Sequence, residues 1–412
     1  MDLIIGAGIS GLSYAAKTQH DYLVIEAENQ IGGYCKTIYK DGFIWDYSGH
    51  FFHFQHPELR DYVMQRIAPD EMLTVQKHTQ ILYKDRHIDF PFQMNIHQLE
   101  QEEFIDCLYD LFTIPEGATS DTFKQMLYAK FGRSIAEKFL IPYNTKLYAT
   151  DLDRLDVDAM GRFFPYANRE QIVRNFRHPE GTSYNATFLY PKDGCIRIIN
   201  SVASHVDSSK ISLNERLLSI DTAAHTVTTD KRNIQYDRLI STIPLPKLLS
   251  LCKIPFNQDI YTWNKVLVFN LGFNAKGPEY TNCWMYIPES KYCFYRVGFY
   301  DNIIGQNRMS LYVEIGFAKD QPIGDMNTLL QRTLDDLHVA GIVTDQQLIA
   351  EHHVLMDPAY VHITSRSETD KEEKFNQLAQ QDIYSIGRYG AWKYCSLEDN
   401  MHDAFTLANR LT

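Results

Sequence analysis

The segment Asp2-Leu-Ile-Ile-Gly6-Ala-Gly8-Ile-Ser-Gly11, next to the N-terminus, decides how the chain is expected to fold. Its apolar start is typical of a buried parallel strand, and the residues that follow have the pattern of a helix. Gly6 permits a tight turn, Gly8 lets a pyrophosphate approach the backbone, and Gly11 allows the helix to pack closely on the strand. The helix N-terminus then faces the phosphates. This strand, turn and helix predict a dinucleotide-binding Rossmann unit.

An acidic residue supports this interpretation. A second predicted strand, Tyr22 to Ile25, is followed directly by Glu26. At this distance from the glycines a carboxylate can accept hydrogen bonds from the adenosine ribose hydroxyls, and it would repel a phosphorylated ribose. Three glycines alone are often just a turn. Here the strand, the spacing and the acid agree, so the sequence predicts a nucleotide site.

A second glycine pair distinguishes flavin from nicotinamide. Gly32-Gly33-Tyr-Cys-Lys-Thr37 resembles the pair that lies along the flavin end of the dinucleotide in FAD enzymes of the amine oxidase, phytoene desaturase and UDP-galactopyranose mutase superfamily. No second Gly-x-Gly-x-x-Gly follows it. We therefore expect one FAD, and any nicotinamide donor would bind without a Rossmann unit of its own.

Composition narrows the remaining classes. The chain has 412 residues, enough for two or three domains. Its net charge of −12 argues against nucleic acid as a partner, although a local arginine pocket can still hold an anionic ligand. Seven scattered cysteines form no Cys-x-x-Cys pair, so we expect reduced thiols and no metal site.

The N-terminus and the hydropathy pattern bear on localisation. The first strand begins almost at Met1, which leaves no room for a signal peptide, and no apolar run approaches membrane-spanning length. We expect a cytoplasmic protein without membrane insertion. The sequence leaves open whether the chain forms a homo-oligomer.

The order of the remaining patterns predicts an α/β fold of three parts. Helical spacing dominates from His97 to about Arg177, and alternating strands follow from Val266 to Phe317. We expect a discontinuous FAD-binding Rossmann-like domain at 1–75, 185–255 and 360–412. A helical domain is expected at 97–180, and an antiparallel β-sheet substrate domain at 76–96 and 256–359. Within these ranges we expect a hairpin at 80–88, a helix at 326–339 and a final helix at 400–410.

Several blocks resemble the UDP-galactopyranose mutase family, and its eukaryotic branch more than its bacterial one. By itself, Phe90-Pro-Phe-Gln-Met-Asn-Ile96 could stack on a base or plug a core. It is similar to the family's uridine-binding loop, which implies that Phe92 and Gln93 stack on and hydrogen-bond a uracil. Pro142-Tyr-Asn-Thr-Lys-Leu-Tyr148 resembles the family's Tyr-Asn-x-Lys-x-Trp segment and implies substrate contacts by Asn144 and Tyr148.

The most specific likeness combines two short blocks. Cys283-Trp-Met-Tyr286 is followed by Cys293-Phe-Tyr-Arg296, as in this family. The resemblance implies that Tyr286 and Arg296 hold the diphosphate of a UDP-sugar. Tyr360 stands near the position of another substrate tyrosine.

The resemblance also extends to the flavin side. Spacing alone leaves His50 equally a core histidine or a ligand, but Gly49-His50 matches the family's flavin-facing pair. Gly387-Arg-Tyr-Gly-Ala-Trp-Lys-Tyr394 resembles the block that contacts flavin and substrate. The complete set of expected cofactor contacts is Gly6, Gly8, Ile9, Ser10, Gly11, Glu26, Ala27, Gly32, Gly33, Tyr34, Gly49, His50, Gly387, Arg388, Asn400 and Met401.

Three positions depart from the family pattern. Arg162 matches the second diphosphate arginine only with a local shift, Ile303 replaces a tyrosine of the eukaryotic branch, and Asn400 lies two residues farther from Tyr394 than the pattern has it. These departures concern the sugar more than the nucleotide.

The resemblance implies a flavin-dependent isomerase with no net redox change, which interconverts UDP-galactopyranose and UDP-galactofuranose or a related nucleotide sugar. Reduced FAD would be the nucleophile, with NAD(P)H as the electron donor by analogy. The expected catalytic residues are Arg296, Arg162, His50 and Tyr394. The alternative is an FAD-dependent oxidoreductase of the amine oxidase or desaturase type, which shares the glycine motifs but gives no reason for the Phe-Pro-Phe-Gln loop together with Arg296.

Overall fold

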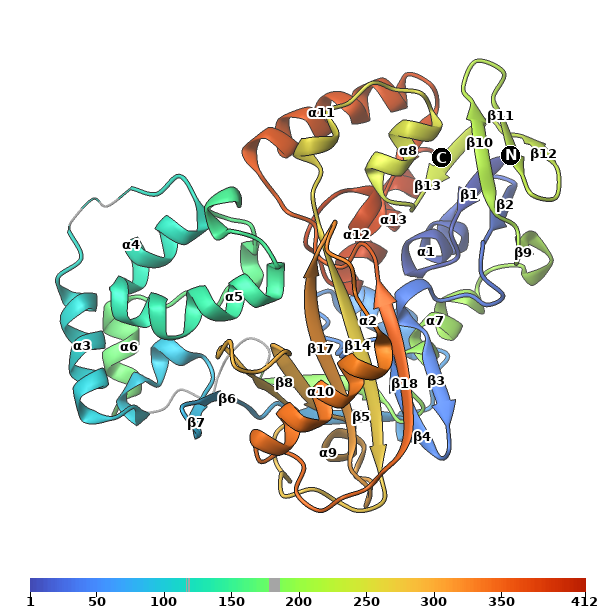
Figure 1. The fold of residues 1–412 in the computed structure, drawn as a ribbon. Helices are drawn as coiled ribbons and strands as arrows, with labels where there is room; N and C mark the ends of the chain where they lie inside the picture. Colours follow the sequence, from blue (N-terminus) through green and yellow to red (C-terminus); the bar gives the residue numbers. More distant parts are fainter. Residues whose placement is uncertain (116, 118, 178–185) are drawn as a thin grey trace.

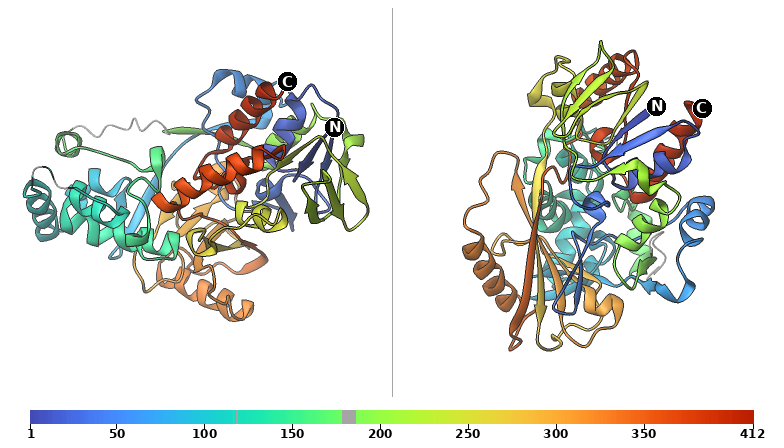
Figure 2. Two further views of the ribbon diagram at one scale, coloured as in Figure 1. Left: turned by 90° about the horizontal axis from the view of Figure 1, so that it is seen from above. Right: turned by 90° about the vertical axis from the view of Figure 1, so that its right-hand side faces the viewer.

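The computed structural model describes residues 1–115, 117, 119–177 and 186–412. Its elements gather into three regions (Figure 1): a parallel sheet with helices that carries both termini, a helical region, and a large sheet. In the view from above in Figure 2, the helical region projects away from the region with the termini. The predicted α/β class is confirmed. The domain boundaries stay predictions, and those at 180 and 185 lie outside the described residues.

The parallel sheet joins strands from distant parts of the sequence. Its order is β19-β13-β1-β2-β9, and every neighbouring pair is parallel. Ile4 of the central strand is fully buried and lies between Val24 and Ile240. A continuous apolar run is what such a doubly covered strand requires. The bounds are β1 Asp2–Ile5, β2 Tyr22–Ile25, β9 Ile211–Ser212, β13 Arg238–Ser241 and β19 Ile383–Ser385.

Helices cover this sheet and complete its core. One apolar cluster includes residues of α1, α2, α7 and α13, and another includes residues of α8 and α11 beside Trp392. The predicted final helix begins earlier than expected, at Leu397, because Ser396 and Asp399 form a capping box at its start. The bounds are α1 Ile9–Lys17, α2 Pro57–Met64, α7 Ile196–Ala203, α8 Leu245–Leu251, α11 Ser365–Ala379, α12 Gly387–Gly390 and α13 Leu397–Arg410.

The large sheet has seven strands in the order β18-β14-β17-β16-β15-β6-β7, antiparallel except between β15 and β6. The hairpin expected at 80–88 and the helix expected at 326–339 are confirmed as β6–β7 and α10. Strand β18 was not predicted, because this half-exposed edge strand lacks a clean alternation of apolar and polar residues. The bounds are β6 Thr79–Tyr83, β7 Arg86–Asp89, β14 Asn264–Phe273, β15 Trp284–Tyr286, β16 Arg296–Phe299, α9 Tyr300–Ile304, β17 Ser310–Ala318, α10 Met326–Val339 and β18 Leu348–Met356.

The helical region is built around aromatic side chains such as Phe123, Phe131 and Phe139, all buried. Its helices are α3 Gln101–Phe112, α4 Phe123–Ile135, α5 Ile141–Tyr148 and α6 Arg169–Asn175. The helical spacing seen in the sequence is therefore confirmed. None of the helices in the described part of the chain is long and apolar enough to span a membrane.

Two strand pairs connect these regions. Strand β3 (Thr37–Lys40) pairs with β4 (Phe43–Asp46), and β5 (Met72–Gln76) pairs with β8 (Thr187–Pro191), both antiparallel. Strand β8 lies outside the parallel sheet, and α7 directly after it packs in the core of the region that carries the termini.

Gly298 tests the packing that supports the large sheet. A Cβ atom at Gly298 would lie 1.8 Å from Cε1 of the buried Tyr312 ring on the neighbouring strand. Because the sheet cannot yield, we expect Gly298→Ala to lower the free energy of unfolding by about 2 kcal/mol or more, measured by urea denaturation. In Gly324→Ala the methyl group meets open space, so backbone strain alone should cost about 1 kcal/mol. Equal losses in the two variants would contradict this account.

Candidate functional site

A cavity of about 260 Å³ lies where the three regions meet. Side chains of the helical region, the large sheet and the start of α13 all contribute to its wall. The wall is rich in aromatic rings and contains two arginines. Its members include Phe90, Tyr143, Asn144, Arg162, Tyr286, Arg296, Tyr360 and Tyr394. An apolar wall with a few convergent polar groups is typical of a small-molecule site.

Arg296 is held in place by a buried carboxylate. It lies on β16 directly opposite Glu314 of β17. Arg296 Nε donates to Glu314 Oε2 at 2.9 Å and Nη2 donates to Oε1 at 2.6 Å. Burial alone would lower the pKa of Arg296, but the Glu314 carboxylate and the neighbouring tyrosine hydroxyls together raise the pKa. One fork of the guanidinium is thus already used, and Nη1 is the amino group that Glu314 does not engage.

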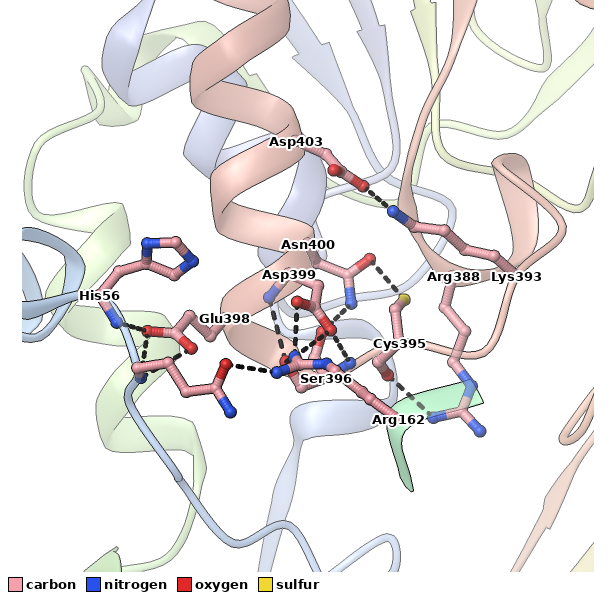
Figure 3. Close-up of polar contacts among 11 residues, drawn as sticks. His56, Arg162, Arg388, Lys393, Cys395, Ser396, Glu398, Asp399, Asn400 and Asp403 are labelled. Carbon is pink, nitrogen blue, oxygen red and sulfur yellow. Dashed lines mark hydrogen bonds and ion pairs between the residues drawn. The ribbon is translucent and has the colours of Figure 1, made fainter. Parts of the chain in front are cut away.

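Arg162 is held differently, as Figure 3 shows. It stands on the short turn Gly161–Phe163 of the helical region and reaches the start of α13, where Nη2 donates to both Asp399 oxygens at 2.7 and 2.8 Å. Nη1 donates to Gln55 Oε1 at 2.6 Å. The Arg162 side chain is 41% exposed, against 18% for Arg296. A half-exposed ion pair exchanges partners more easily than a buried one.

Tyrosines form the wall between the arginines. Tyr360 and Tyr394 stack with ring centroids 5.8 Å apart, and the Arg388 guanidinium lies 5.2 and 4.7 Å from the same two rings. Tyr286 contacts Phe90 and Tyr143 at 4.7 and 5.1 Å between centroids. Burial raises the pKa of Tyr360, so its hydroxyl stays protonated and can donate a hydrogen bond.

Asn144 offers an acceptor to the cavity. Its Nδ2 donates to the Leu140 carbonyl at 2.7 Å, whereas its buried Oδ1 has no hydrogen-bond partner among the described residues. A buried polar atom of this kind needs a partner, which a bound ligand can supply.

Lys146, in the same segment, serves the fold. Its ammonium donates to the carbonyls of Ile287 at 3.0 Å and Glu289 at 2.9 Å, and also to that of Phe294. These bonds fasten α5 to the loop between β15 and β16, the two strands that carry Tyr286 and Arg296.

The structure does not bring every predicted substrate residue to the cavity. Phe92 and Gln93 are fully buried outside its lining; Phe92 stacks on Phe139 at 5.2 Å, and Phe90 of the same loop faces the cavity instead. Tyr148 lies behind Tyr360 at 6.0 Å. Substrate contacts by Phe92, Gln93 and Tyr148 stay predictions. Ile303, the departure from the family pattern, is buried on α9 beside the large sheet.

Glu314 and Asp399 were missed in the sequence. Glu314 stands within Leu-Tyr-Val-Glu-Ile-Gly-Phe, and an acid in such an apolar strand needs a cationic partner when buried. That signal could have pointed to Glu314. Asp399 had no such signal, because its partner Arg162 comes from a distant part of the sequence.

The glycine segments form a backbone cradle next to this cavity. Gly11 has no room for a side chain, since a Cβ would lie 2.0 Å from the Gly6 carbonyl oxygen. The second glycine pair meets the first: Gly32 N donates to Ala7 O at 2.9 Å, and Gly8 faces Gly33. Gly8 is the N-cap of helix α1 and offers no side-chain cap. The free N–H groups of the helix suit a phosphate.

The expected acid lies beside the cradle. Glu26 Oε2 accepts from Ala7 N at 2.8 Å and Oε1 accepts from Glu28 N at 2.9 Å, which fixes the carboxylate at the end of β2. Ala27 follows it and is half-buried. Ile9 and Met401 are core residues between α1 and α13, so their role in binding a cofactor rests on their backbones and stays a prediction.

Other predicted cofactor residues lie around the glycine cradle and the start of α13. Ser10 donates to Asn400 Oδ1 at 3.3 Å, which joins α1 to α13. A Cβ at Gly387 would lie 2.7 Å from Ser10 Oγ. Arg388 Nη1 donates to the Cys395 carbonyl at 3.5 Å, as drawn in Figure 3, and its buried Nε has no partner among the described residues. Tyr34 accepts from Asp357 N at 2.9 Å.

His50 is neutral and has a defined tautomer. Burial lowers its pKa below the ordinary value of histidine. Nδ1 lies 2.9 Å from the Ser48 carbonyl, and because a carbonyl can only accept, Nδ1 carries the hydrogen. Nε2 is therefore an acceptor. The preceding Gly49 lines the cavity and packs against Tyr312, whose hydroxyl would lie 2.5 Å from a Cβ there.

These features fit FAD. The glycine cradle, the uncapped helix and Glu26 match the pyrophosphate and ribose of a dinucleotide, and Arg388 offers an unpaired buried donor nearby. The family of flavin containing amine oxidoreductases matches residues 9–338. The chain belongs to this family. Membership indicates FAD as the cofactor.

Solved structures agree with the fold of this family. A reduced UDP-galactopyranose mutase is similar with a TM-score of 0.92 and 24% sequence identity, over 100% of this chain and 93% of that one. Cyclohexylamine oxidase from Brevibacterium oxydans IH-35A has a TM-score of 0.71 and 13% identity, over 100% and 99%. A CLA-producing fatty acid isomerase from P. acnes has 0.68 and 14%, over 99% and 98%. At these identities the likeness shows the fold alone, and the similar structures include an oxidase and two isomerising enzymes by their names.

His362 allows a pH test of the core behind the cavity wall. Its Nε2–H donates to Tyr148 O at 2.9 Å, its Nδ1 accepts from Thr262 Oγ1 at 2.9 Å, and burial lowers its pKa to about 4. The unfolded chain binds the proton first as the pH falls. We therefore expect His362 to contribute stability above pH 6.5 that is lost towards pH 4, up to about 3 kcal/mol.

The measurement is the free energy of unfolding between pH 4 and 7.5. His362→Gln should show a shallower pH dependence than the wild type, because the amide does not titrate. His87→Gln, at an exposed position, should keep the wild-type slope. Parallel curves for the wild type and His362→Gln would refute the assignment.

Proposed function

We propose that the protein is a flavin-dependent isomerase that interconverts the pyranose and furanose forms of a UDP-sugar, with UDP-galactose as the first candidate. The observation that carries this proposal is the pair of arginines in one aromatic cavity, each oriented by its own carboxylate, beside a dinucleotide cradle. An amine substrate gives no reason for two guanidinium groups. A diphosphate does, because guanidinium binds phosphate oxygens well.

In this proposal Arg296 and Arg162 bind the diphosphate and stabilise the charge that develops on it when the bond to the sugar breaks. Arg296 uses Nη1, since Glu314 occupies its other face. Arg162 releases Asp399 to reach the substrate. The hydroxyls of Tyr286, Tyr360 and Tyr394 donate further hydrogen bonds from the wall, and Asn144 Oδ1 accepts one from a sugar or ribose hydroxyl.

When bound and reduced, FAD supplies the nucleophile for the anomeric carbon. The chain's part is to hold and polarise it. Neutral His50 presents Nε2 as an acceptor, and Arg388 provides positive charge close to Tyr394. We expect a nicotinamide nucleotide to deliver the electrons.

The second candidate is an oxidoreductase of the amine oxidase type. The family match and the likeness to cyclohexylamine oxidase favour it. In that case the cavity would take an uncharged or cationic substrate, and the arginines would remain paired with Glu314 and Asp399.

An anaerobic assay separates the two candidates. The FAD-loaded protein is incubated with UDP-galactofuranose, with and without dithionite, and the UDP-sugars are separated by chromatography. We expect UDP-galactopyranose only in the reduced sample. If no UDP-sugar isomerises and UDP does not bind, while amines cause oxygen consumption in a separate aerobic assay, the oxidoreductase is correct.

Arg296→Lys tests the proposed role of the guanidinium. Lysine keeps the positive charge that Glu314 requires but loses the planar fork. Losing one charge-assisted hydrogen bond costs about 1.5–3 kcal/mol, so we expect kcat/KM to fall about tenfold to a hundredfold while FAD stays bound. Arg308→Lys, at a half-buried position outside the cavity, is the matched control. Wild-type kcat/KM in Arg296→Lys would remove Arg296 from the mechanism.

A further inference from the structure

Glu314 contacts two parts of the site at once. Its carboxylate binds Arg296, and Oε1 also accepts a hydrogen bond from Ser48 Oγ. The Ser48 carbonyl in turn accepts from His50 Nδ1 at 2.9 Å. Hydrogen bonds on either side of Ser48, joined through the covalent frame of that residue, therefore connect the guanidinium in the cavity wall to the imidazole of the turn 48–50.

The middle of this chain of contacts is shielded from water. Glu314 has no exposed surface and Ser48 is 7% exposed. Tyr300 fixes the same turn from the other side, since its hydroxyl donates to the Ser48 carbonyl at 3.3 Å. Buried charged groups have few alternative partners, so a displacement of one is passed to the next instead of being absorbed by solvent.

We infer that Glu314 is a positioning residue that couples the substrate-binding arginine to the flavin-facing turn 48–50. The inference rests on the proposed function and on the expected place of the flavin beside His50. A ligand phosphate that binds Arg296 Nη1 displaces the guanidinium relative to Glu314, and this displacement is passed on to Ser48 and the His50 ring. Binding in the cavity then changes the surroundings of the flavin. Because coupling is reciprocal, the state of the flavin alters ligand affinity by the same factor.

Two variants separate the arms of this connection. Glu314→Gln keeps the shape of the side chain but removes the charge from both arms. Ser48→Ala leaves the Arg296–Glu314 pair intact and removes the link to the turn. The matched control is Glu215→Gln. Glu215 is also buried and binds Arg232 through both oxygens at 3.0 Å. It also accepts a hydrogen bond from the Thr229 hydroxyl.

The experiment uses the FAD-loaded enzyme and UDP as the probe. We measure the flavin midpoint potential and visible spectrum without ligand, then titrate UDP and record both the Kd and the size of the flavin spectral change. Glu314→Gln should raise the Kd at least tenfold and alter the ligand-free potential. Ser48→Ala should keep the Kd within about threefold but lose most of the UDP-induced spectral change. Glu215→Gln should match the wild type in all three readouts.

The inference is overturned if Ser48→Ala and Glu314→Gln both leave the ligand-free potential and spectrum as they are in Glu215→Gln. It is also overturned if Ser48→Ala retains the full UDP-induced spectral change. If Glu314→Gln loses FAD, Ser48→Ala decides alone. If the wild type does not bind UDP, the proposed function fails, and the ligand-free potentials still decide whether Glu314 positions the turn.

Discussion

The cost of burying charge governs the architecture of this cavity. A guanidinium can lie in an aromatic wall only if a carboxylate meets it there, and Arg296 meets Glu314 across two neighbouring strands. The register of β16 and β17 places them opposite each other, and the small Gly298 beside them leaves room for the Tyr312 ring. The sheet therefore holds the cation in one orientation before any ligand arrives, which is the condition for electrostatic stabilisation without reorganisation.

The dinucleotide cradle depends on local sequence, and this is why it could be predicted. Gly6, Gly8 and Gly11 are close in the chain, and each answers a steric demand of the strand–helix turn. Glu26 follows at the end of the next strand. The second glycine pair meets the first through one backbone hydrogen bond, from Gly32 to Ala7. Helix α10 was also predicted within its own bounds, since its apolar spacing is regular.

The cavity depends on contacts between distant segments, so less of it than of the glycine cradle could be predicted from the sequence. Arg162 and Asp399 are 237 residues apart, and no local pattern predicts their ion pair. Likewise the loop at 90–96 contains two aromatic and two amide side chains, and spacing cannot tell that Phe90 faces the cavity while Phe92 stacks on Phe139. The predicted start of α13, at Asn400, was three residues too late because the capping box at Ser396 was overlooked.

The bridge from Arg162 to Asp399 has a consequence for what the cavity admits. This contact fastens the helical region to α13 in the absence of ligand, so a molecule that needs Arg162 must compete with a carboxylate for it. A phosphate can form charge-assisted hydrogen bonds with the guanidinium as Asp399 does, whereas a neutral molecule of the same shape cannot. Under the proposed function, every ligand that binds Arg162 must first break the ion pair with Asp399, and only an anion can replace that carboxylate.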